Sequence, residues 1–421
     1  MVLKHLHLDN VRCFDQLDLR FASRPRSRGQ WTVLLGDNGV GKSTILKALA
    51  VALSPLSDLT RYPEGRLQRL GAPPGRVALQ TSAGDLELEL GAATRTFGFT
   101  PLVFAYGAAR GSALGGPSRS VDLEHPLGAV GTLFNQPPGL IHAETWLRNL
   151  AFGALRSKGG GDEGFFESVC ATLVGLLPGV DRIEPESDAV YVEGPAVGRT
   201  TFDGLSDGFA TTIGWTCDLI ARWAHARRGP SRSRTQATQS AVNLDRDFRE
   251  QMTGLVLVDE LDLHLHPRWQ VRVIEDLRAA FPCLSFVVTT HNPLTLLGAR
   301  PREIHVLTRE SDGIHARQQD VPPGSRADAV LTGPWFGLAS TLDADTVRRL
   351  EEYQKAAAGG ATRAELRDVE VELRQRLGSF GDTAEERLAL RLVAETSSEL
   401  PLAKEDRADL KRRMRSLLGE P

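Results

Sequence analysis

Alternating apolar and polar residues dominate the first hundred positions. The stretch LKHLHLDNVRCFDQLDLRF (residues 3–21) repeats with a period of two, which is typical of strands that have one buried face. The same alternation returns between residues 75 and 107, in RVALQTS, DLELELG, TRTFGFT and LVFAYG. We therefore expect these runs to form one antiparallel N-terminal sheet, with a turn or hairpin tip at residues 23–30.

Three apolar runs that scarcely alternate predict a second sheet. WTVLL, LVLV and LSFVV begin at residues 31, 255 and 284, and continuous apolar runs are typical of strands buried on both faces. Each run leads through a polar turn into a helical pattern, the first of which spans about residues 43–53. Strand–turn–helix units in series indicate an α/β fold with a parallel core sheet. EIHVLTRE and GIHARQQD (residues 303–320) predict a closing hairpin.

Helical periodicity marks two further parts of the chain. IHAETWLRNLAFGAL and EGFFESVCATLVGLL (residues 141–177) predict helices, and GLSD leads from a loop into a long helix that ends near residue 226. From residue 340 onward the chain predicts mixed-charge helix, with capping boxes that begin at Thr362 and Thr383. This small helical region either completes the fold or provides a docking site for a partner protein.

The turn after the first buried strand carries a phosphate-binding motif. GDNGVGKS (residues 36–43) matches the pattern GxxxxGK[ST] completely. Glycines let successive backbone N–H groups point at a phosphate, the helix N-terminus adds positive charge, and the lysine neutralises the β- and γ-phosphates, which makes it catalytic. The motif predicts an ATP site made of Gly36, Asp37, Asn38, Gly39, Val40, Gly41, Lys42, Ser43 and Thr44.

Two acids, Asp259 and Glu260, follow the buried strand LVLV. An acid at the carboxyl end of a strand can hold Mg²⁺, which the hydroxyl of Ser43 would also bind, and the next acid can polarise the attacking water. We therefore assign Asp259 and Ser43 to Mg²⁺ and Glu260 to catalysis. The alternative is that both acids only cap the turn that follows.

Two short motifs complete the expected site. Ser206 and Gly208 lie in LSDG (residues 205–208), where a hydroxyl and a backbone N–H at a helix N-terminus suit a γ-phosphate, although a plain N-cap looks the same. His291 follows the strand LSFVV and would contact the γ-phosphate as a catalytic residue. The order of the four motifs along the chain resembles that of ABC-type ATPases.

Composition and charge disfavour several kinds of site and partner. The net charge is −3, so contact with DNA would need a local basic patch. The four cysteines are scattered without a CxxC pair, which argues against zinc and disulfides and favours a reducing compartment. No apolar run approaches the length of a membrane span. We expect a cytoplasmic protein with no membrane partner.

Two groups of arginines are the candidate basic patches. They are Arg24, Arg26 and Arg28 near the N-terminus, and Arg222, Arg227, Arg228, Arg232 and Arg234 before the acidic motif. These residues either belong to solvated loops or contact a phosphate backbone. Only one aromatic residue, Trp223, is interleaved with them, which disfavours stacking on single-stranded nucleic acid.

The stretch VDELDLHLHPRWQ (residues 258–270) points to one branch of the ATPases. It resembles the DExxxHLHP pattern of RecF, OLD and related proteins, and DNVRCF with LLGDNGVGKST resembles the N-terminal strand and phosphate loop of the same group. FAYGAAR, GTLFNQPPGL and AETWLRNL (within residues 104–150) look like the insertion of defence-associated ATPases such as the Septu ATPase. The tail from FGLASTLDADTVRRLEEYQK onward is similar to their helical C-terminus.

The resemblance implies an α/β fold of the ABC-type P-loop ATPase head, with a mixed parallel core sheet, an antiparallel N-terminal sheet, a helical insertion and a helical C-terminal region. The expected parts are an N-terminal ATPase lobe (1–135), a mainly helical insertion (136–200), a C-terminal ATPase lobe (201–320) and the C-terminal helices (321–421).

The resemblance also implies a function and partners. Two chains would pack head to tail around ATP and Mg²⁺, as a dimer or within a higher oligomer. The ATPase would regulate a separate effector, such as an HNH nuclease, in bacterial anti-phage defence. One alternative is a RecF-like repair ATPase that binds DNA directly, and a further one is the ATPase subunit of a transporter, which the HLHP stretch disfavours.

The chain departs from the ABC pattern at several points. Asp207 replaces the glycine of many signature motifs, and residues 106–110 occupy the place where a Q-loop glutamine is expected. The C-terminus has no acidic cluster of the Toprim nuclease type, so we expect no nuclease in this chain. His264 and His266, which stand beside the acidic motif, either lie at the dimer seam or pack within the fold, or they bind a metal.

Overall fold

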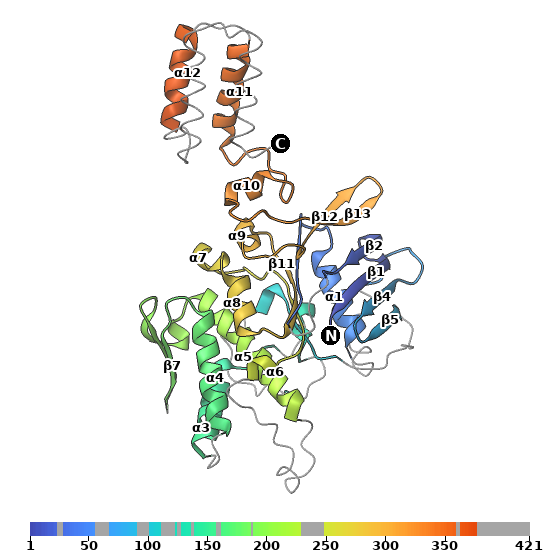
Figure 1. The fold of residues 1–421 in the computed structure, drawn as a ribbon, viewed down its shortest axis with the longest axis vertical. Helices are drawn as coiled ribbons and strands as arrows, with labels where there is room; N and C mark the ends of the chain where they lie inside the picture. The colour runs from blue at the N-terminus through green and yellow to red at the C-terminus, as the bar shows by residue number, and fades with distance from the viewer. Residues whose placement is uncertain are drawn as a thin grey trace. The chain divides into compact units, whose positions relative to one another are not determined.

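The computed structural model describes residues 1–22, 28–54, 67–90, 101–110, 123, 128–135, 139–156, 161–186, 188–228, 248–358 and 363–376. The chain divides into two units, Met1–Gly337 and Leu338–Pro421. The first unit contains two large sheets, one small sheet and most of the helices, and it holds all four motifs of the expected nucleotide site (Figure 1).

The core sheet of the first unit has the strand order β13-β12-β3-β11-β10-β6. Its strands are β3 (Trp31–Gly36), β6 (Val103–Tyr106), β10 (Gly254–Val258), β11 (Leu284–Thr289), β12 (Ile304–Glu310) and β13 (Gly313–Gln318). Neighbouring strands from β12 to β6 are parallel, whereas β13 pairs with β12 in antiparallel fashion. The apolar runs form central strands because both of their faces are covered.

The four-stranded N-terminal sheet has the order β2-β1-β4-β5 and is antiparallel. It consists of β1 (Leu3–Val11), β2 (Phe14–Arg20), β4 (Arg76–Thr81) and β5 (Gly84–Glu89). One expectation about it was wrong: LVFAYG forms β6, which joins the core sheet parallel to β10. The run TRTFGFT lies outside the described residues.

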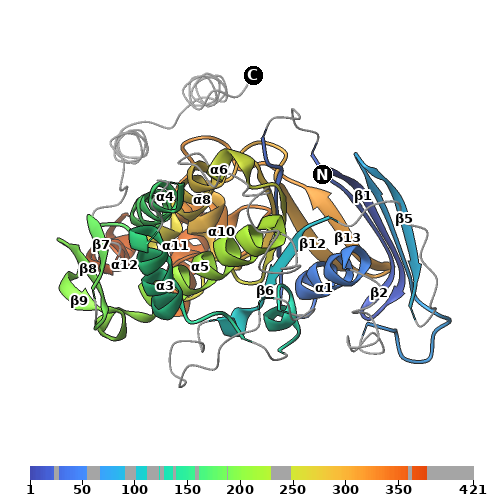
Figure 2. The ribbon, with the colours of Figure 1, turned by 90° about the horizontal axis from the view of Figure 1, so that it is seen from below.

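Helix α1 (Lys42–Leu53) separates the two sheets. Figure 2 shows it between the core strands and the curved N-terminal sheet. Ten of its twelve residues are buried, because both flanks pack against apolar sheet faces. Five residues connect the end of β3 to the N-terminus of this helix, and they belong to the loop that carries the phosphate-binding motif.

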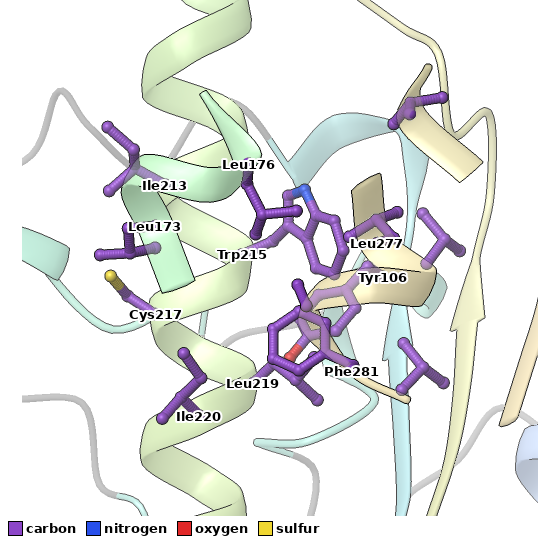
Figure 3. Packing of buried hydrophobic residues seen from close by; sticks show 14 of the residues in the cluster. Tyr106, Leu173, Leu176, Ile213, Trp215, Cys217, Leu219, Ile220, Leu277 and Phe281 are labelled. Atoms are coloured by element: carbon purple, nitrogen blue, oxygen red, sulfur yellow. The ribbon is translucent and has the colours of Figure 1, made fainter. Parts of the chain in front are cut away.

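The opposite face of the core sheet is covered by four other helices. They are α3 (Ala143–Arg156), α4 (Gly161–Leu176), α5 (Asp207–Arg228) and α8 (Val273–Ala280). Figure 3 shows Trp215 of α5 packed beside Leu176 of α4, with Tyr106 and Phe281 next to them. The Trp215 and Tyr106 ring centroids are 5.4 Å apart. This core therefore joins β6 to the helix that follows the LSDG motif.

Short elements complete the first unit. The small antiparallel sheet contains β7 (Arg182–Pro185), β8 (Val190–Gly194) and β9 (Gly198–Thr201). The short helices are η3 (Gly131–Phe134), η4 (Phe202–Gly204), α6 (Phe248–Gln251), α7 (Pro267–Gln270), α9 (Pro293–Leu296) and α10 (Ala327–Thr332). No helix among the described residues is both long and apolar enough to cross a bilayer.

The second unit contains a helical hairpin, α11 (Ala344–Ala358) and α12 (Arg363–Arg376). Arg349 pairs with Glu372, and Arg376 contacts Asp345 at 2.6 Å, so the two helices run antiparallel. Leu373 is buried between them. Both predicted capping boxes begin outside the described residues, at Thr362 and Thr383. The α/β class, the mixed core sheet and the antiparallel N-terminal sheet are confirmed.

Candidate nucleotide-binding site

One cavity of about 340 Å³ lies at the carboxyl end of the core sheet, beside the N-terminus of α1. The phosphate loop (residues 36–43) forms one wall, and the residues that follow β10 and β11 form the other. Its lining residues are Arg12, Cys13, Asn38, Gly39, Gly41, Lys42, Ser43, Thr44, Asp259, Glu260, Thr289 and His291. The structure thus brings three of the four sequence motifs together.

The loop needs glycine at both of its ends. Gly36 has φ +145°, and a Cβ there would lie 2.4 Å from the carbonyl oxygen of Leu307 on β12. Gly41 has φ +96°, and a Cβ there would lie 2.4 Å from the Phe14 ring and 2.6 Å from the Cys13 sulfur. Only glycine fits these backbone conformations and this space. Val40, between them, is buried and anchors the loop to the core.

Lys42 and the first turn of α1 provide positive charge. The Lys42 side chain is almost wholly buried, and its Nζ donates to the carbonyl oxygens of Gly36 (2.8 Å) and Asp37 (2.9 Å). Burial lowers the pKa of Lys42, while the nearby carboxylate of Asp259 opposes this effect. The helix has no acidic residue in its first turn, and Gly41 supplies no side-chain cap. Its N-terminal N–H groups can therefore bind an anion.

Thr289, at the end of β11, orients the two acids across the cavity. Its hydroxyl donates to Asp259 Oδ1 (2.7 Å) and accepts the backbone N–H of Glu260 (2.7 Å). The N–H of Asp259 donates to the carbonyl oxygen of Tyr106 on β6 (2.8 Å). The Asp259 carboxylate and the Ser43 hydroxyl face the same cavity, and oxygen ligands of this kind suit Mg²⁺.

Arg110 contacts the other side of the acidic turn (residues 259–261). Its guanidinium donates to the carbonyl oxygens of Asp259 (2.5 Å), Glu260 (2.7 Å) and Leu261 (3.1 Å). Burial lowers the pKa of Arg110 to about 10, so the guanidinium is charged at neutral pH. Residues 106–110 stand where a Q-loop glutamine was expected. Within this segment, Arg110 is the residue that contacts the acidic turn.

His291 lines the cavity and lies two residues after the end of β11. Burial and the charge of Lys42 lower the pKa of His291 below its usual 6.5, despite the opposing charge of Glu260. The imidazole is therefore neutral at pH 7. A neutral imidazole can donate a hydrogen bond from one ring nitrogen and accept one at the other.

Ser206 and Gly208 do not line this cavity. Ser206 is exposed at the start of α5, and Gly208 packs so closely against the stretch after the acidic turn that a Cβ would lie 2.6 Å from the carbonyl oxygen of His264. His266 caps α7 by accepting the N–H of Arg268 at 3.3 Å. Within the described parts of the chain, neither histidine belongs to a group of three closely spaced metal-ligand side chains.

The arginine groups are only partly described. Arg24, Arg26, Arg232 and Arg234 lie outside the described residues. Arg222 was wrongly placed in a solvated or phosphate-binding patch, because it is 4% exposed and bonds to the fully buried Asp218 one helical turn away. The Arg227 guanidinium lies over the Trp223 ring, 5.9 Å from its centroid.

Three residues of this region were missed by the sequence analysis. Arg12 and Cys13 occupy the tight turn between β1 and β2 and line the cavity, and Arg309 of β12 donates to the carbonyl oxygen of Gly39 at 3.3 Å. The DNVRCF stretch was the available signal for the first two. No signal in the sequence pointed to Arg309, because an arginine in a β-hairpin is ordinarily a surface residue.

The fold and this grouping of motifs define an α/β protein of the P-loop ATPase class. A family model described as an AAA domain matches residues 5–85, and another, described as an AAA domain, putative AbiEii toxin, Type IV TA system, matches residues 184–297. The chain is similar to the Septu protein PtuA of Bacillus mycoides, with 26% identity over 81% of this chain and 45% of that protein. The resemblance to Septu-type ATPases is thereby confirmed.

Other relatives match shorter parts of the chain. A Septu protein PtuA of Bacillus thuringiensis is 39% identical over 24% of this chain and 27% of that protein. A Retron Ec83 probable ATPase of Escherichia coli is 56% identical over 10% of this chain and 8% of that protein. The chain spans less than half the length of these relatives.

Comparison with solved structures finds heads of SMC proteins. The SMC head domain from Thermotoga maritima is 16% identical, covers 76% of this chain and all of its own, and has a TM-score of 0.40. The Pyrococcus furiosus Smc head with an extended coiled coil is 12% identical over 76% of this chain and 96% of its own, with a TM-score of 0.46.

Proposed function

We propose that the chain is an ATPase that closes head to tail with a second copy around ATP and Mg²⁺. Lys42 and the N–H groups of the phosphate loop would hold the phosphates. Ser43 and Asp259 would bind Mg²⁺, and the ion would neutralise the triphosphate. Glu260 would accept a proton from the attacking water, and the neutral His291 would donate a hydrogen bond to the γ-phosphate.

The dimer proposal rests on the observation that LSDG lies outside the cavity. Ser206 is exposed and lies outside the cavity that the other three motifs form, although a hydroxyl at a helix N-terminus suits a phosphate. A second copy, rotated by a two-fold axis, would place its Ser206 and Gly208 over the first copy's phosphate loop. ATP would then join two copies, and hydrolysis would release them.

The similarity to Septu PtuA and to retron ATPases supports a role in anti-phage defence. In this role the ATP-bound assembly would control a separate effector, which we expect to be a nuclease such as an HNH protein. The chain would supply nucleotide-dependent switching, and the effector would supply the cleavage. Co-purification of an effector encoded beside this chain tests the pairing. Strong stimulation of ATP hydrolysis by DNA, without an effector, would favour the RecF-like alternative.

Complementation between two inactive variants tests the composite site directly. Lys42→Ala removes phosphate binding from a copy's own cavity, and Ser206→Arg blocks the face that it would offer to a partner. Each variant alone should be inactive, whereas a mixed dimer contains one intact site and should regain ATP hydrolysis. Glu260→Gln should trap an ATP-bound dimer, seen by light scattering after size exclusion. An unchanged mass with ATP, together with failure to complement, would refute the dimer.

A further inference from the structure

The acidic turn has a backbone conformation that needs support. Glu260 has φ +50°, in the left-handed region that residues other than glycine and asparagine rarely adopt. Such a conformation persists only where surrounding contacts hold it. The direction of the Glu260 side chain depends on this conformation, so whatever holds the backbone also sets the position of the carboxylate.

Thr289 supports the acidic turn by accepting two of the turn's backbone N–H groups. Its hydroxyl accepts the Glu260 N–H (2.7 Å), and its carbonyl oxygen accepts the N–H of Leu261 (3.0 Å). These bonds leave the carbonyl oxygens of the turn pointing into the protein. Buried carbonyl oxygens require donors of their own.

Arg110 supplies donors to all three carbonyl oxygens, and the Leu263 N–H adds a second donor at Glu260 (3.1 Å). Nη1 donates to Asp259 (2.5 Å), and Nη2 donates to Glu260 (2.7 Å) and Leu261 (3.1 Å), so one guanidinium spans three successive carbonyl oxygens. The residue is only 2% exposed and does not line the nucleotide cavity. A planar fork of N–H donors can bridge separate carbonyl groups in this way, whereas a lysine ammonium acts as a point charge.

The guanidinium is itself fixed. Nη1 also donates to the Gly107 carbonyl oxygen (3.2 Å), within the turn that follows β6. Gly107 packs tightly on η3, where a Cβ would lie 2.3 Å from the carbonyl oxygen of Thr132. The arginine therefore projects from a supported turn rather than from a free loop.

We propose that Arg110 is a positioning residue that orients Asp259 and Glu260 for Mg²⁺ binding and ATP hydrolysis. It acts through the backbone of the acidic turn and does not touch the nucleotide. This role rests on the function proposed above, and it assigns to an arginine the place where a Q-loop glutamine was expected. Arg110 acts on the Mg²⁺ and water side of the cavity, whereas the phosphate loop is independent of it.

Arg110→Lys is the decisive variant, because it keeps the charge and removes the fork. We expect kcat to fall about 10- to 100-fold, the effect typical of losing a contact that orients metal ligands. Binding of the fluorescent nucleotide mant-ATP in EDTA should stay within about twofold of wild type, because Lys42 and its loop are untouched. The increase in mant-ATP affinity on adding Mg²⁺ should shrink. Arg110→Gln should behave like Arg110→Lys.

Arg278→Lys is the matched control. Arg278 is also buried, and its fork binds both carboxylate oxygens of Glu303 (3.0 and 2.9 Å) away from the cavity. This control should change thermal stability but neither kcat nor the Mg²⁺ effect. A wild-type kcat in Arg110→Lys, or an equal loss of mant-ATP binding with and without Mg²⁺, would overturn the positioning role. If wild type hydrolyses no ATP, the proposed function fails, while the Mg²⁺ dependence of mant-ATP binding still tests Arg110.

Discussion

Replacing Asp218 by asparagine should strongly destabilise the first unit, because this carboxylate is the centre of a buried network. Arg222 Nε donates to both of its oxygens (3.0 and 2.9 Å), the Tyr106 hydroxyl donates to Oδ2 (3.1 Å), and the Ile141 N–H donates to Oδ1 (3.0 Å). Asp218 is fully buried, and Arg222 is 4% exposed. The network joins α5 to β6 and to the segment that leads into α3.

The magnitude follows from what each variant leaves behind. In Asp218→Asn the amide oxygen could still accept the Ile141 N–H, and the amide NH2 could donate to the Tyr106 hydroxyl oxygen. Arg222, however, would remain buried and charged without a counter-ion, which costs about 3–5 kcal/mol. Burial raises the pKa of Asp218 even with Arg222 beside it, so the pair gains little over exposed ions. We therefore expect the lower end, about 3 kcal/mol. Tyr106→Phe loses one bond to a charged group and should cost about 1.5–3 kcal/mol.

Equilibrium unfolding in urea measures these losses as midpoint shifts at constant slope. Adding Arg222→Met to Asp218→Asn should recover most of the stability, because it removes the unpaired charge while keeping the shape. Glu87→Gln breaks the exposed Arg76–Glu87 pair and should leave the midpoint unchanged. A wild-type midpoint for Asp218→Asn, or additive losses in the double variant, would refute the reasoning.

Two further predictions concern the cavity. Gly41→Ala forces a Cβ to within 2.4 Å of the Phe14 ring and should weaken mant-ATP binding about 10- to 100-fold, whereas Gly153→Ala on α3, where nothing lies within 4 Å, should have no effect. Unchanged affinity in Gly41→Ala would contradict the loop geometry. Because burial and Lys42 lower the pKa of His291 in the nucleotide-free chain, kcat/KM should fall on the acid side with a midpoint below pH 6.5. A pH profile with a midpoint above 6.5, or an unaltered acid limb in His291→Gln, would contradict this assignment.

Much of the candidate site was predictable because its motifs are short and contiguous. The loop from Gly36 to Ser43 and the pair Asp259–Glu260 each need only local spacing to be recognised. Arg110 was not predictable, because its partners lie 149 to 151 residues further along the chain. Only the tertiary fold shows that its side chain turns inward to the acidic turn.

Two errors in the sequence analysis concern buried residues whose surroundings the sequence does not show. LVFAYG contains a strand of only four residues, and all four are buried, so its alternation could not reveal which sheet it joins. Arg222 was grouped with arginines nearby in the sequence, although Asp218 lies four residues earlier on the same helix. That i,i+4 spacing was a readable signal of an ion pair. Composition alone could not show that the pair faces the core.

Strand β6 is the element that ties the LSDG helix to the acidic turn. The Tyr106 side chain bonds to Asp218 of α5, while its carbonyl oxygen accepts the N–H of Asp259. Four residues later, Arg110 bonds to the carbonyl oxygens of the acidic turn. The residues recognised as motifs supply the chemistry of a nucleotide site, but their geometry depends on contacts from a strand that has no motif. Variants of Tyr106 and Arg110 therefore distinguish loss of geometry from loss of chemistry.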